Sequence, residues 1–286
     1  MSKTYVLYNP KADSGKGREE AEAVKKYVGE GAEFVDAIAE GGYAAFLKRV
    51  NGDDTLIVCG GDGTLNRFIN DADPDALPEK VLYFATGTGN DFLRDIGKET
   101  GCEPIDLKPY IKGLPSVFIN GKESKFINGI GYGIDGYCCE VGDQQRAAGV
   151  EKINYAGIAI KGLLFHYKTT NAKVTVDGVT HEFKKVWLAP TMNGRYYGGG
   201  MNATPDQDRL NNDTLSTLVF FGKGKIRTLM AFPSIFKGEH VKYTNMVKIF
   251  TGKHIKVEFD RPTPLQIDGE TVLGVTSYEV KSKAAL

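Results

Sequence analysis

The stretch TLIVCGGDGTLN at residues 55–66 decides the fold class of the first half of the chain. Apolar and β-branched residues fill its first five positions, which is the composition of a buried strand. A glycine-rich loop follows, and apolar residues then recur with helical spacing as far as Ile69. A strand that passes through such a loop into a helix is typical of a βα unit in a parallel sheet.

The same order recurs through the first hundred residues. Strand-like runs and helical patterns alternate, the runs at residues 5–8, 32–35, 55–59 and 81–85 and the helical patterns at residues 19–28, 43–50 and 65–69. Because strands alternating with helices form parallel sheets covered on both faces, the sequence predicts a doubly wound parallel α/β domain over residues 1–113.

The pattern changes near Leu114. Strand-like residues now flank tight-turn dipeptides at residues 120–121, 177–178 and 268–269, and asparagine or aspartate followed by glycine is the strongest short hairpin signal. Helical patterns interrupt these strands at residues 152–167 and 225–236. We expect residues 114–286 to form a mostly antiparallel β-sandwich domain, with the active site in the cleft between the two domains.

The composition limits the partners. Lysine and arginine number 36 and aspartate and glutamate also 36, so no overall positive field attracts nucleic acid, and we expect no nucleic-acid partner. Any contact with a membrane surface must therefore be local. The 286 residues, 41% of them hydrophobic, can bury a substantial core.

The cysteines and the hydropathy pattern predict the compartment. The four cysteines lack metal-site spacing and two of them are neighbours, which fits reduced thiols in the cytoplasm. The four histidines have no ligand spacing either. Because no run of about 18 apolar residues occurs, we expect a protein that is neither secreted nor membrane-spanning. It would be cytoplasmic, with transient peripheral membrane association.

Three strands of the first domain are followed by loops suited to phosphate. Backbone N–H groups in glycine-rich loops and at helix N-termini bind anions where parallel strands end. A single such loop is more often structural, but three in succession favour a nucleotide site. The candidate residues are Asn9, Pro10, Lys11, Ala12, Asp13 and Lys16 in the first loop, Gly60, Gly61, Asp62, Gly63, Thr64, Leu65 and Asn66 in the second, and Thr88, Asn90 and Asp91 in the third.

Two further features qualify this interpretation. The first loop is not a P-loop, because Pro10 and Gly17 occupy positions that require glycine and serine or threonine. In the third loop, Asn90 or Asp91 could instead cap the following helix. The Asp62 carboxylate beside bound phosphate would need a cation, which predicts Mg²⁺.

The loop sequences resemble a known family. GGDGT at residues 60–64, followed by GTGNDF at residues 87–92 and preceded by Asn9-Pro10, is similar to the diacylglycerol kinase catalytic domain of bacterial lipid kinases and sphingosine kinases. NAD kinases are more distant and lack the second loop sequence. Later landmarks match in order at residues 197–201 and 267–270. The resemblance implies ATP contacts by residues 9–13, residues 60–66 and Thr88, with Asp62 near the phosphates and Mg²⁺.

The resemblance also implies roles in the second domain. Glu270 would be the catalytic base with Asp268 as its partner, although Asp268-Gly269 is also a hairpin turn, as Asp177-Gly178 is expected to be. Asp135 would contact the acceptor. A structural Mg²⁺ would be held by the Asp213 carboxylate and by main-chain carbonyls at Leu210 and Leu215, but the sequence from Asn212 to Ser216 departs from the family pattern.

The glycines at positions 131, 133 and 136 form a G-x-G-x-x-G pattern, but they follow a predicted hairpin, so a dinucleotide fingerprint is not indicated. Two apolar segments bear on lipid access. Residues 155–165 suit a buried core helix better than an acyl-chain groove, whereas residues 229–236, interrupted by Pro233, suit a core helix and a surface lid equally.

We therefore expect an ATP-dependent and Mg²⁺-dependent kinase that phosphorylates the hydroxyl of a membrane lipid, with diacylglycerol leading and phosphatidic acid as product. A kinase for a soluble acceptor such as NAD, and a non-catalytic nucleotide or lipid sensor, are the alternatives. The sequence leaves open which lipid alcohol is used and whether the chain forms a homodimer.

Overall fold

The computed structural model describes residues 2–87, 90–150, 153–210 and 213–285. The chain divides into two compact units, residues 1–114 and residues 115–286, and each is described by itself. The predicted fold class, a parallel α/β sheet followed by an antiparallel β domain, is confirmed. Within the described part of the chain, no helix combines the length and apolarity that crossing a bilayer requires.

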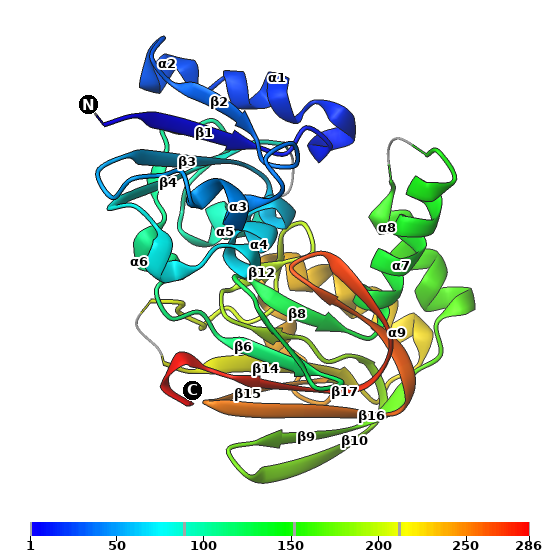
Figure 1. Ribbon diagram of the computed structural model, residues 1–286. Helices are drawn as coiled ribbons and strands as arrows, with labels where there is room; N and C mark the ends of the chain where they lie inside the picture. The colour runs from blue at the N-terminus through cyan, green and yellow to red at the C-terminus, as the bar shows by residue number, and fades with distance from the viewer. Residues whose placement is uncertain (1, 88–89, 151–152, 211–212, 286) are drawn as a thin grey trace. The chain divides into compact units, whose positions relative to one another are not determined.

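The first unit is built on a five-stranded sheet (Figure 1). Its order is β2-β1-β3-β4-β5, with the first four strands parallel and β5 antiparallel to β4. The central strand β3 is buried from its second residue on, as its continuous apolar sequence predicts. The strands are β1 (Thr4–Tyr8), β2 (Glu33–Asp36), β3 (Thr55–Gly60), β4 (Lys80–Ala85) and β5 (Ile105–Asp106).

The helices of this unit are short. They are η1 (Ala12–Gly15), α1 (Gly17–Glu22), α2 (Lys25–Val28), α3 (Tyr43–Leu47), α4 (Asp62–Asp71), η2 (Pro74–Ala76), α5 (Asp91–Asp95) and α6 (Lys108–Ile111). The single helix predicted over residues 19–28 is wrong in detail, because the chain tightens between α1 and α2. There the N–H groups of Ala23 and Val24 donate to carbonyls three residues back rather than four.

The second unit contains a ten-stranded sheet with order β7-β6-β17-β16-β8-β11-β14-β10-β9, and β15 pairs with β14. Strand β9 also pairs with β16, so the strands from β16 to β9 close on themselves. The strands are β6 (Ser116–Ile119), β7 (Lys122–Lys125), β8 (Gly129–Tyr132), β9 (Thr170–Val176), β10 (Val179–Leu188), β11 (Thr191–Met192), β14 (Leu215–Phe221), β15 (Val247–Gly252), β16 (His254–Ile267) and β17 (Glu270–Lys281), with β12 (Tyr196–Tyr197) and β13 (Met201–Asn202) as a separate pair.

All three predicted hairpins are present, as β6–β7, β9–β10 and β16–β17. Their turns begin with Asn120, Asp177 and Asp268, which adopt positive φ angles of 51°, 47° and 47°. Asparagine and aspartate tolerate this backbone conformation better than most residues, and glycine follows each of them. The dipeptide signal was therefore sufficient to place the turns.

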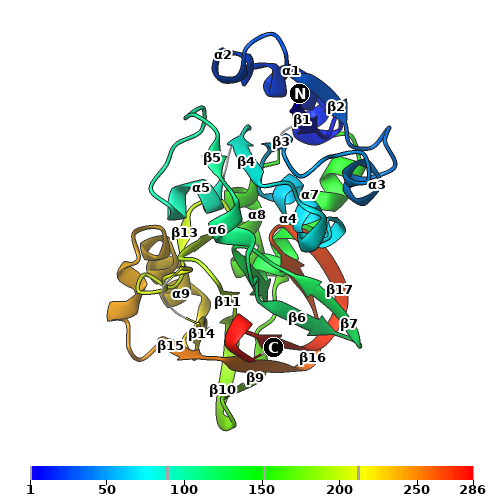
Figure 2. The ribbon, with the colours of Figure 1, turned by 60° about the vertical axis from the view of Figure 1, so that its left-hand side comes forward.

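The helical segments of the second unit are α7 (Ile134–Ala147), α8 (Tyr155–Lys161), the short π-helical segment η3 (Gly162–His166), α9 (Lys225–Ala231), η4 (Phe232–Lys237), η5 (Glu239–Lys242) and η6 (Lys283–Ala285). Helix α7 contacts α8, and η4 contacts β13 beside α9 (Figure 2). The predicted helix over residues 152–167 begins later, and Lys152 lies outside the described residues. Pro233 stands in the first turn of η4, which explains why α9 ends at Ala231.

Helix α7 was not predicted. Its sequence contains glycines at positions 136 and 142, which lower helix propensity and obscure the apolar period. The structure gives both glycines a packing reason. A Cβ on Gly136 would overlap the Pro264 carbonyl, and one on Gly142 would lie 2.8 Å from the Tyr155 ring. Both positions are glycine because α7 approaches its neighbours too closely there for a larger side chain.

Candidate nucleotide and acceptor sites

The three predicted loops leave one edge of the first sheet. Strands β1, β3 and β4 are parallel neighbours, with Tyr8 beside Cys59, Cys59 beside Phe84, and Gly60 beside Ala85. The loops that follow these strands therefore start side by side. Adjacent loops of this kind can present several backbone N–H groups to one anion.

The first loop is a tight turn around Asn9. The buried Asn9 side chain accepts a hydrogen bond from the Lys11 N–H through Oδ1 at 2.9 Å, and its carbonyl accepts one from the Ala12 N–H at 3.0 Å. Gly17 packs directly on the Asn9 carbonyl, where a Cβ would overlap the oxygen. Lys11 and Lys16 are exposed on this turn. The loop is thus compact and carries two accessible cations.

The second loop leads into α4, which begins at Asp62. Gly60 has a φ of +155°, and a Cβ there would overlap Thr64. Thr64, Leu65 and Asn66 are buried. The loop therefore has space for backbone only, as its glycines predict.

Asp62 joins the second loop to the third. Its Oδ2 accepts a hydrogen bond from the Asp91 N–H at 2.7 Å and its Oδ1 one from the Phe92 N–H at 3.2 Å. The carboxylate thus caps the N-terminus of α5 from another segment, which the helix dipole favours. The expectation that Asn90 caps this helix is wrong, because its side chain makes no such bond.

Asn90 is instead tied to the strand before it. Its Nδ2 donates to the Thr86 carbonyl and the Thr100 hydroxyl, both at 3.2 Å, while its Oδ1 accepts from the Tyr83 hydroxyl at 3.2 Å. Tyr83 also lies 2.8 Å from the Gly60 carbonyl, so it connects the loops after β3 and β4. Burial, together with the nearby Asp62 charge, holds the pKa of Tyr83 well above its ordinary value.

No sequence signal marked Tyr83, because a tyrosine in a buried strand is an ordinary core residue. A pocket of about 520 Å³ borders the third loop, and its polar lining includes Asn90, Asp91, Arg94 and Thr100. Thr88 and Gly89 lie outside the described residues.

In the second unit, the predicted acidic turn is organised around Asp268. Its buried carboxylate accepts three backbone hydrogen bonds, from the N–H groups of Ile127 at 2.7 Å, Asn128 at 2.9 Å and Gly129 at 2.9 Å. The Asp268 N–H in turn donates to the Gly129 carbonyl at 3.0 Å. These bonds join the β16–β17 turn to the start of β8, far away in the sequence, so Asp268 positions the turn.

Glu270 lies at the exposed start of β17, directly after this turn. The neighbouring Thr271 hydroxyl donates to Asp143 on α7 at 2.7 Å. The Glu270 charge also helps to raise the pKa of Cys139 to about 12, an effect due mainly to burial of that thiol. Glu270 therefore belongs to the same neighbourhood as α7.

Asp135 lies at the N-terminal end of α7 and is buried. The Tyr197 hydroxyl donates to its Oδ2 at 2.8 Å, and the Gly136 N–H donates to its Oδ1 at 3.0 Å. Burial raises the pKa of Asp135 to about 6, although these hydrogen bonds oppose the rise. Tyr197 is the first residue of the glycine-rich landmark at residues 197–201, and the structure gives it this contact.

Gln266 connects Asp135 with the acidic turn. A Cβ on Gly131 would overlap the Asp135 carboxylate and would lie 2.6 Å from Gln266 Nε2, so both side chains occupy the space that the glycine leaves. Gln266 Oε1 accepts from the Gly269 N–H at 2.6 Å. Nothing in the sequence singled out this buried glutamine. Gln266 therefore lies between Asp135 and the turn before Glu270.

The structural Mg²⁺ site expected at Leu210, Asp213 and Leu215 stays a prediction. Leu210 and Asp213 are exposed, whereas Leu215 is buried within β14. The loop is held by a neutral network in which Gln207 Nε2 donates to the Thr214 carbonyl at 2.9 Å and the Ser216 hydroxyl donates to Gln207 Oε1 at 2.6 Å. Asn212 lies outside the described residues.

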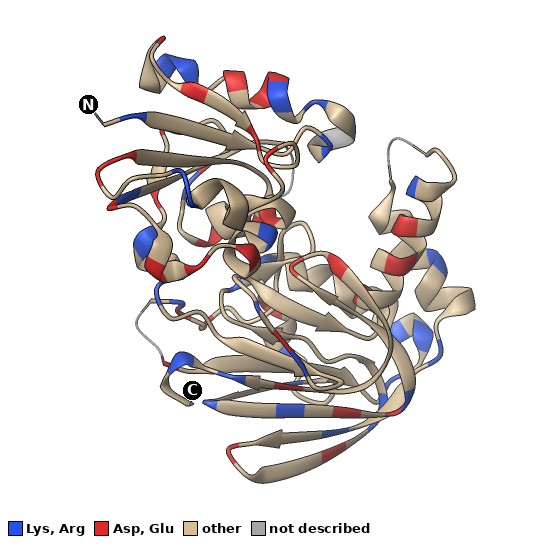
Figure 3. Cartoon of the chain, in the orientation of Figure 1, with Lys and Arg blue, Asp and Glu red and all other residues tan. Residues whose placement is uncertain are grey.

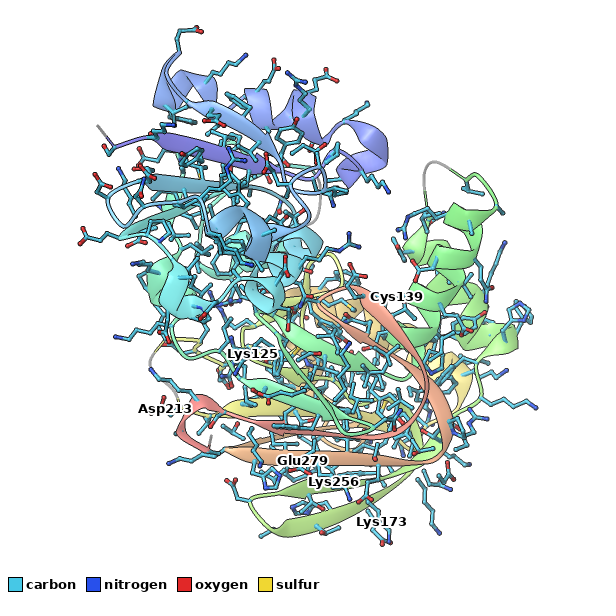
Figure 4. The ribbon with its side chains drawn as sticks, in the orientation of Figure 1. Lys125, Cys139, Lys173, Asp213, Lys256 and Glu279 are labelled. Atoms are coloured by element: carbon cyan, nitrogen blue, oxygen red, sulfur yellow. The ribbon has the colours of Figure 1, made fainter. Side chains whose placement is uncertain are left out.

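Across the described ranges, no group of three or more acidic, histidine or cysteine side chains could hold a metal ion. Figure 4 places Asp213 at the end of the second unit opposite Cys139, the α7 residue one turn after Asp135.

Comparison with known proteins agrees with this division of the chain. Residues 3–114 match the diacylglycerol kinase catalytic domain, and residues 128–283 match the YegS C-terminal NAD kinase beta sandwich-like domain. A parallel nucleotide-type unit followed by this β unit defines a kinase. The chain belongs to the diacylglycerol kinase-like lipid kinase family, as its loop sequences predict.

Individual relatives are similar over most of their length. The YtlR protein of Bacillus subtilis, whose lipid-kinase name is provisional, is 26% identical over 79% of this chain and 77% of its own. A diacylglycerol kinase of Mycobacterium tuberculosis is 24% identical over 85% of this chain and 81% of its own. A crystal structure of a diacylglycerol kinase from Bacillus anthracis shares the fold with a TM-score of 0.60 and 20% identity, covering 99% of this chain and 94% of that one.

Proposed function

We propose that this protein transfers the γ-phosphate of ATP to the hydroxyl of a membrane lipid, with diacylglycerol as the leading substrate and phosphatidic acid as product. The observation that carries the proposal is that three loops follow adjacent parallel strands, the second and third joined by the hydrogen bonds of Asp62 to the N-terminus of α5. Membership of the lipid kinase family supports the choice of acceptor.

The nucleotide would bind along the loop edge of the first sheet. The N–H groups of the second loop and the N-terminus of the ten-residue helix α4 would face the phosphates, and Lys11 and Lys16 would add positive charge. The substrate is Mg-ATP, so the cation arrives with the nucleotide. Because two backbone N–H groups fix the Asp62 carboxylate, it would keep a constant orientation beside that cation.

The acceptor would be activated by the second unit. Phosphoryl transfer depends mainly on position and charge neutralisation. The acceptor hydroxyl oxygen forms a bond to the γ-phosphorus, the bond between that phosphorus and the β,γ-bridging oxygen breaks to release ADP, and the hydroxyl proton moves to Glu270. Asp268 fixes the turn that presents Glu270, and Asp135 with Tyr197 would orient the lipid headgroup.

The experiment is a transfer assay with γ-labelled ATP, Mg²⁺ and either mixed-lipid vesicles or NAD as acceptor. We expect label in the organic phase, migrating as phosphatidic acid, and loss of at least 100-fold in rate for Glu270→Gln. This substitution keeps the size of the side chain. Label found only on NAD, or an unchanged rate for Glu270→Gln, would refute the proposal. Label on another lipid alcohol would replace diacylglycerol but keep the lipid kinase.

A further inference from the structure

The second unit carries a group of large apolar side chains that face solvent. Met230, Phe165 and Ile226 are 76%, 73% and 73% exposed, the three highest values among the large apolar residues that the structure describes as exposed. Ile160 and Phe236 add 48% and 49%. We call these five residues the apolar platform. Single exposed apolar residues are ordinary, but several on neighbouring segments indicate a contact surface.

The platform comes from two segments that pack together. Ile160 and Phe165 belong to α8 and η3, whereas the other three belong to α9 and η4. Segment η3 contacts α9, and the Lys225 ammonium at the start of α9 donates to the Leu164 carbonyl at 2.6 Å. Two regions some 60 residues apart therefore contribute to one surface.

The exposed residues are not needed to hold these segments in place. On α9, Thr228 and Ala231 are buried, while Ile226 and Met230 lie one turn apart on the outward face. On the other segment, Leu163 is fully buried and Phe165 points outward. Because the inward residues already pack on the core, the outward ones are available to a partner.

The charged residues of the two segments that carry the platform have one sign. Residues 153–170 and 222–238 contain no aspartate or glutamate, although the whole chain has 36 acidic and 36 basic residues. The basic residues of these segments lie on and beside α8, η3, α9 and η4, and α9 carries blue but no red in Figure 3. They are Lys161, Lys168, Lys223, Lys225, Arg227 and Lys237. A local positive field thus exists on a chain without net charge.

We propose that the apolar platform docks on a membrane that contains anionic lipids. Phe165, Ile226 and Met230 insert at the boundary between headgroups and acyl chains, and the surrounding lysine and arginine side chains contact lipid phosphates. Apolar insertion surrounded by basic groups is the combination that stabilises proteins at anionic bilayer surfaces. This inference rests on the proposed function, because it names how that enzyme reaches its lipid.

A second copy of the chain is a poorer occupant. A two-fold interface would place the six basic residues of one platform against the same six of the other, and such like-charge contacts are destabilising. A bilayer with anionic headgroups offers the opposite charge together with an apolar layer. The platform also belongs to the unit that carries Glu270, since α8 contacts α7, and α7 contacts β16 and β17.

The first test measures binding alone, without ATP. The protein is sedimented with vesicles of phosphatidylcholine, with or without phosphatidylglycerol. We expect tighter binding to the anionic vesicles and a loss of about tenfold or more for Ile226→Ser/Met230→Ser, because two inserted side chains are removed. Val179→Ser is the matched control, since Val179 is 60% exposed on the β9–β10 hairpin and should leave binding unchanged.

Two further variants test insertion and charge separately. The indole introduced by Phe165→Trp should be quenched by brominated acyl chains, whereas the buried Trp187 should not. Lys223→Gln/Arg227→Gln should reduce the preference for anionic vesicles by about 25-fold, at roughly fivefold for each charge. Equal binding to both vesicle types, or no quenching, would overturn the docking proposal. So would variants that bind vesicles normally but lose self-association or a protein partner.

A kinase assay keeps docking apart from the proposed function. A short-chain diacylglycerol dissolved below its micelle concentration needs no docking, so Ile226→Ser/Met230→Ser should phosphorylate it at the wild-type rate and lose activity only on vesicles. Equal losses on both substrates would refute docking as the role of the platform. If wild-type protein binds anionic vesicles but phosphorylates neither form, the proposed function fails while the docking surface stands.

Discussion

Replacement of Asp268 by asparagine tests whether the acidic turn is held together by this carboxylate. Three buried backbone N–H groups converge on its two oxygens at 2.7 to 2.9 Å. In Asp268→Asn an NH₂ group replaces one oxygen and faces at least one of these donors. One N–H then loses its acceptor, at a cost of about 1–3 kcal/mol, and the others lose the charge that strengthens them. We expect the second unit to lose about 3 kcal/mol of stability in total.

Trp187 makes this loss measurable. It is the only tryptophan of the chain and is buried in the second unit, so its fluorescence reports unfolding of that unit. With a urea dependence of about 2 kcal/mol per molar, the midpoint should fall by about 1.5 M. The exposed Glu270→Gln should stay within about 0.5 kcal/mol of wild type.

The outcome separates two roles for Asp268. A wild-type urea midpoint for Asp268→Asn would refute the hydrogen-bond reasoning. If such a variant were also inactive, Asp268 would act in the reaction itself and not through the position of the turn. We expect instead that stability and activity fall together for Asp268→Asn, while Glu270→Gln loses activity alone.

Three further predictions follow from the buried contacts. Tyr83→Phe leaves the Gly60 carbonyl without the hydroxyl donor at 2.8 Å, so the first unit should lose about 1–2 kcal/mol of stability. ATP should bind several-fold more weakly by calorimetry, and the unfolding transition of Trp187 should not change. A wild-type ATP affinity would contradict the link between the two loops. Burial raises the pKa of Asp135 from 3.8 to about 6, so at intermediate pH the folded state holds a proton that the unfolded chain has released. The free energy of unfolding should therefore fall by about 3 kcal/mol as the pH rises from about 4 through about 6. Asp135→Asn should lack this fall in urea titrations, and parallel pH profiles for the two proteins would contradict the assignment. Gly136→Ala should destabilise the second unit because the added methyl would overlap the Pro264 carbonyl. Helix propensity alone predicts the opposite, a gain of about 1 kcal/mol. An increased melting temperature would show that α7 can shift to make room.

The first half of the fold could be predicted because its signals are local. A buried strand requires a continuous apolar run, and the glycine-rich loops fix where strand ends and helix begins, so TLIVCGGDGTLN placed both β3 and α4. The hairpin turns could also be predicted from local sequence. Each turn needs only a residue that tolerates a positive φ angle followed by glycine, and Asp177 and Asp268 are such residues. Helix α7 was missed because its glycines are required by close contacts with Pro264 and Tyr155, which lie on other elements.

The candidate site divides in the same way. The glycine-rich loops could be predicted because glycine and small polar residues after a strand have a meaning that does not depend on distant neighbours. The role of Glu270 came only from the family resemblance and stays a prediction. The partners of Asp62 and the link through Gln266 could not be found, because a carboxylate or an amide in the sequence does not indicate which distant N–H groups it accepts. The metal loop expected at Leu210, Asp213 and Leu215 stays a prediction.

By itself, the sequence determined the alternation of strands and helices in the first unit, the three hairpin turns, the glycine-rich loops and the family, because each depends on residues close together in the chain. Only the tertiary structure decided that β9 closes on β16, that Asp62 caps α5, that Asp268 holds the start of β8, and that α9 and η3 together expose Met230 and Phe165. These contacts join residues far apart in sequence. They form because buried polar groups must find partners and buried apolar faces must fit one another in three dimensions.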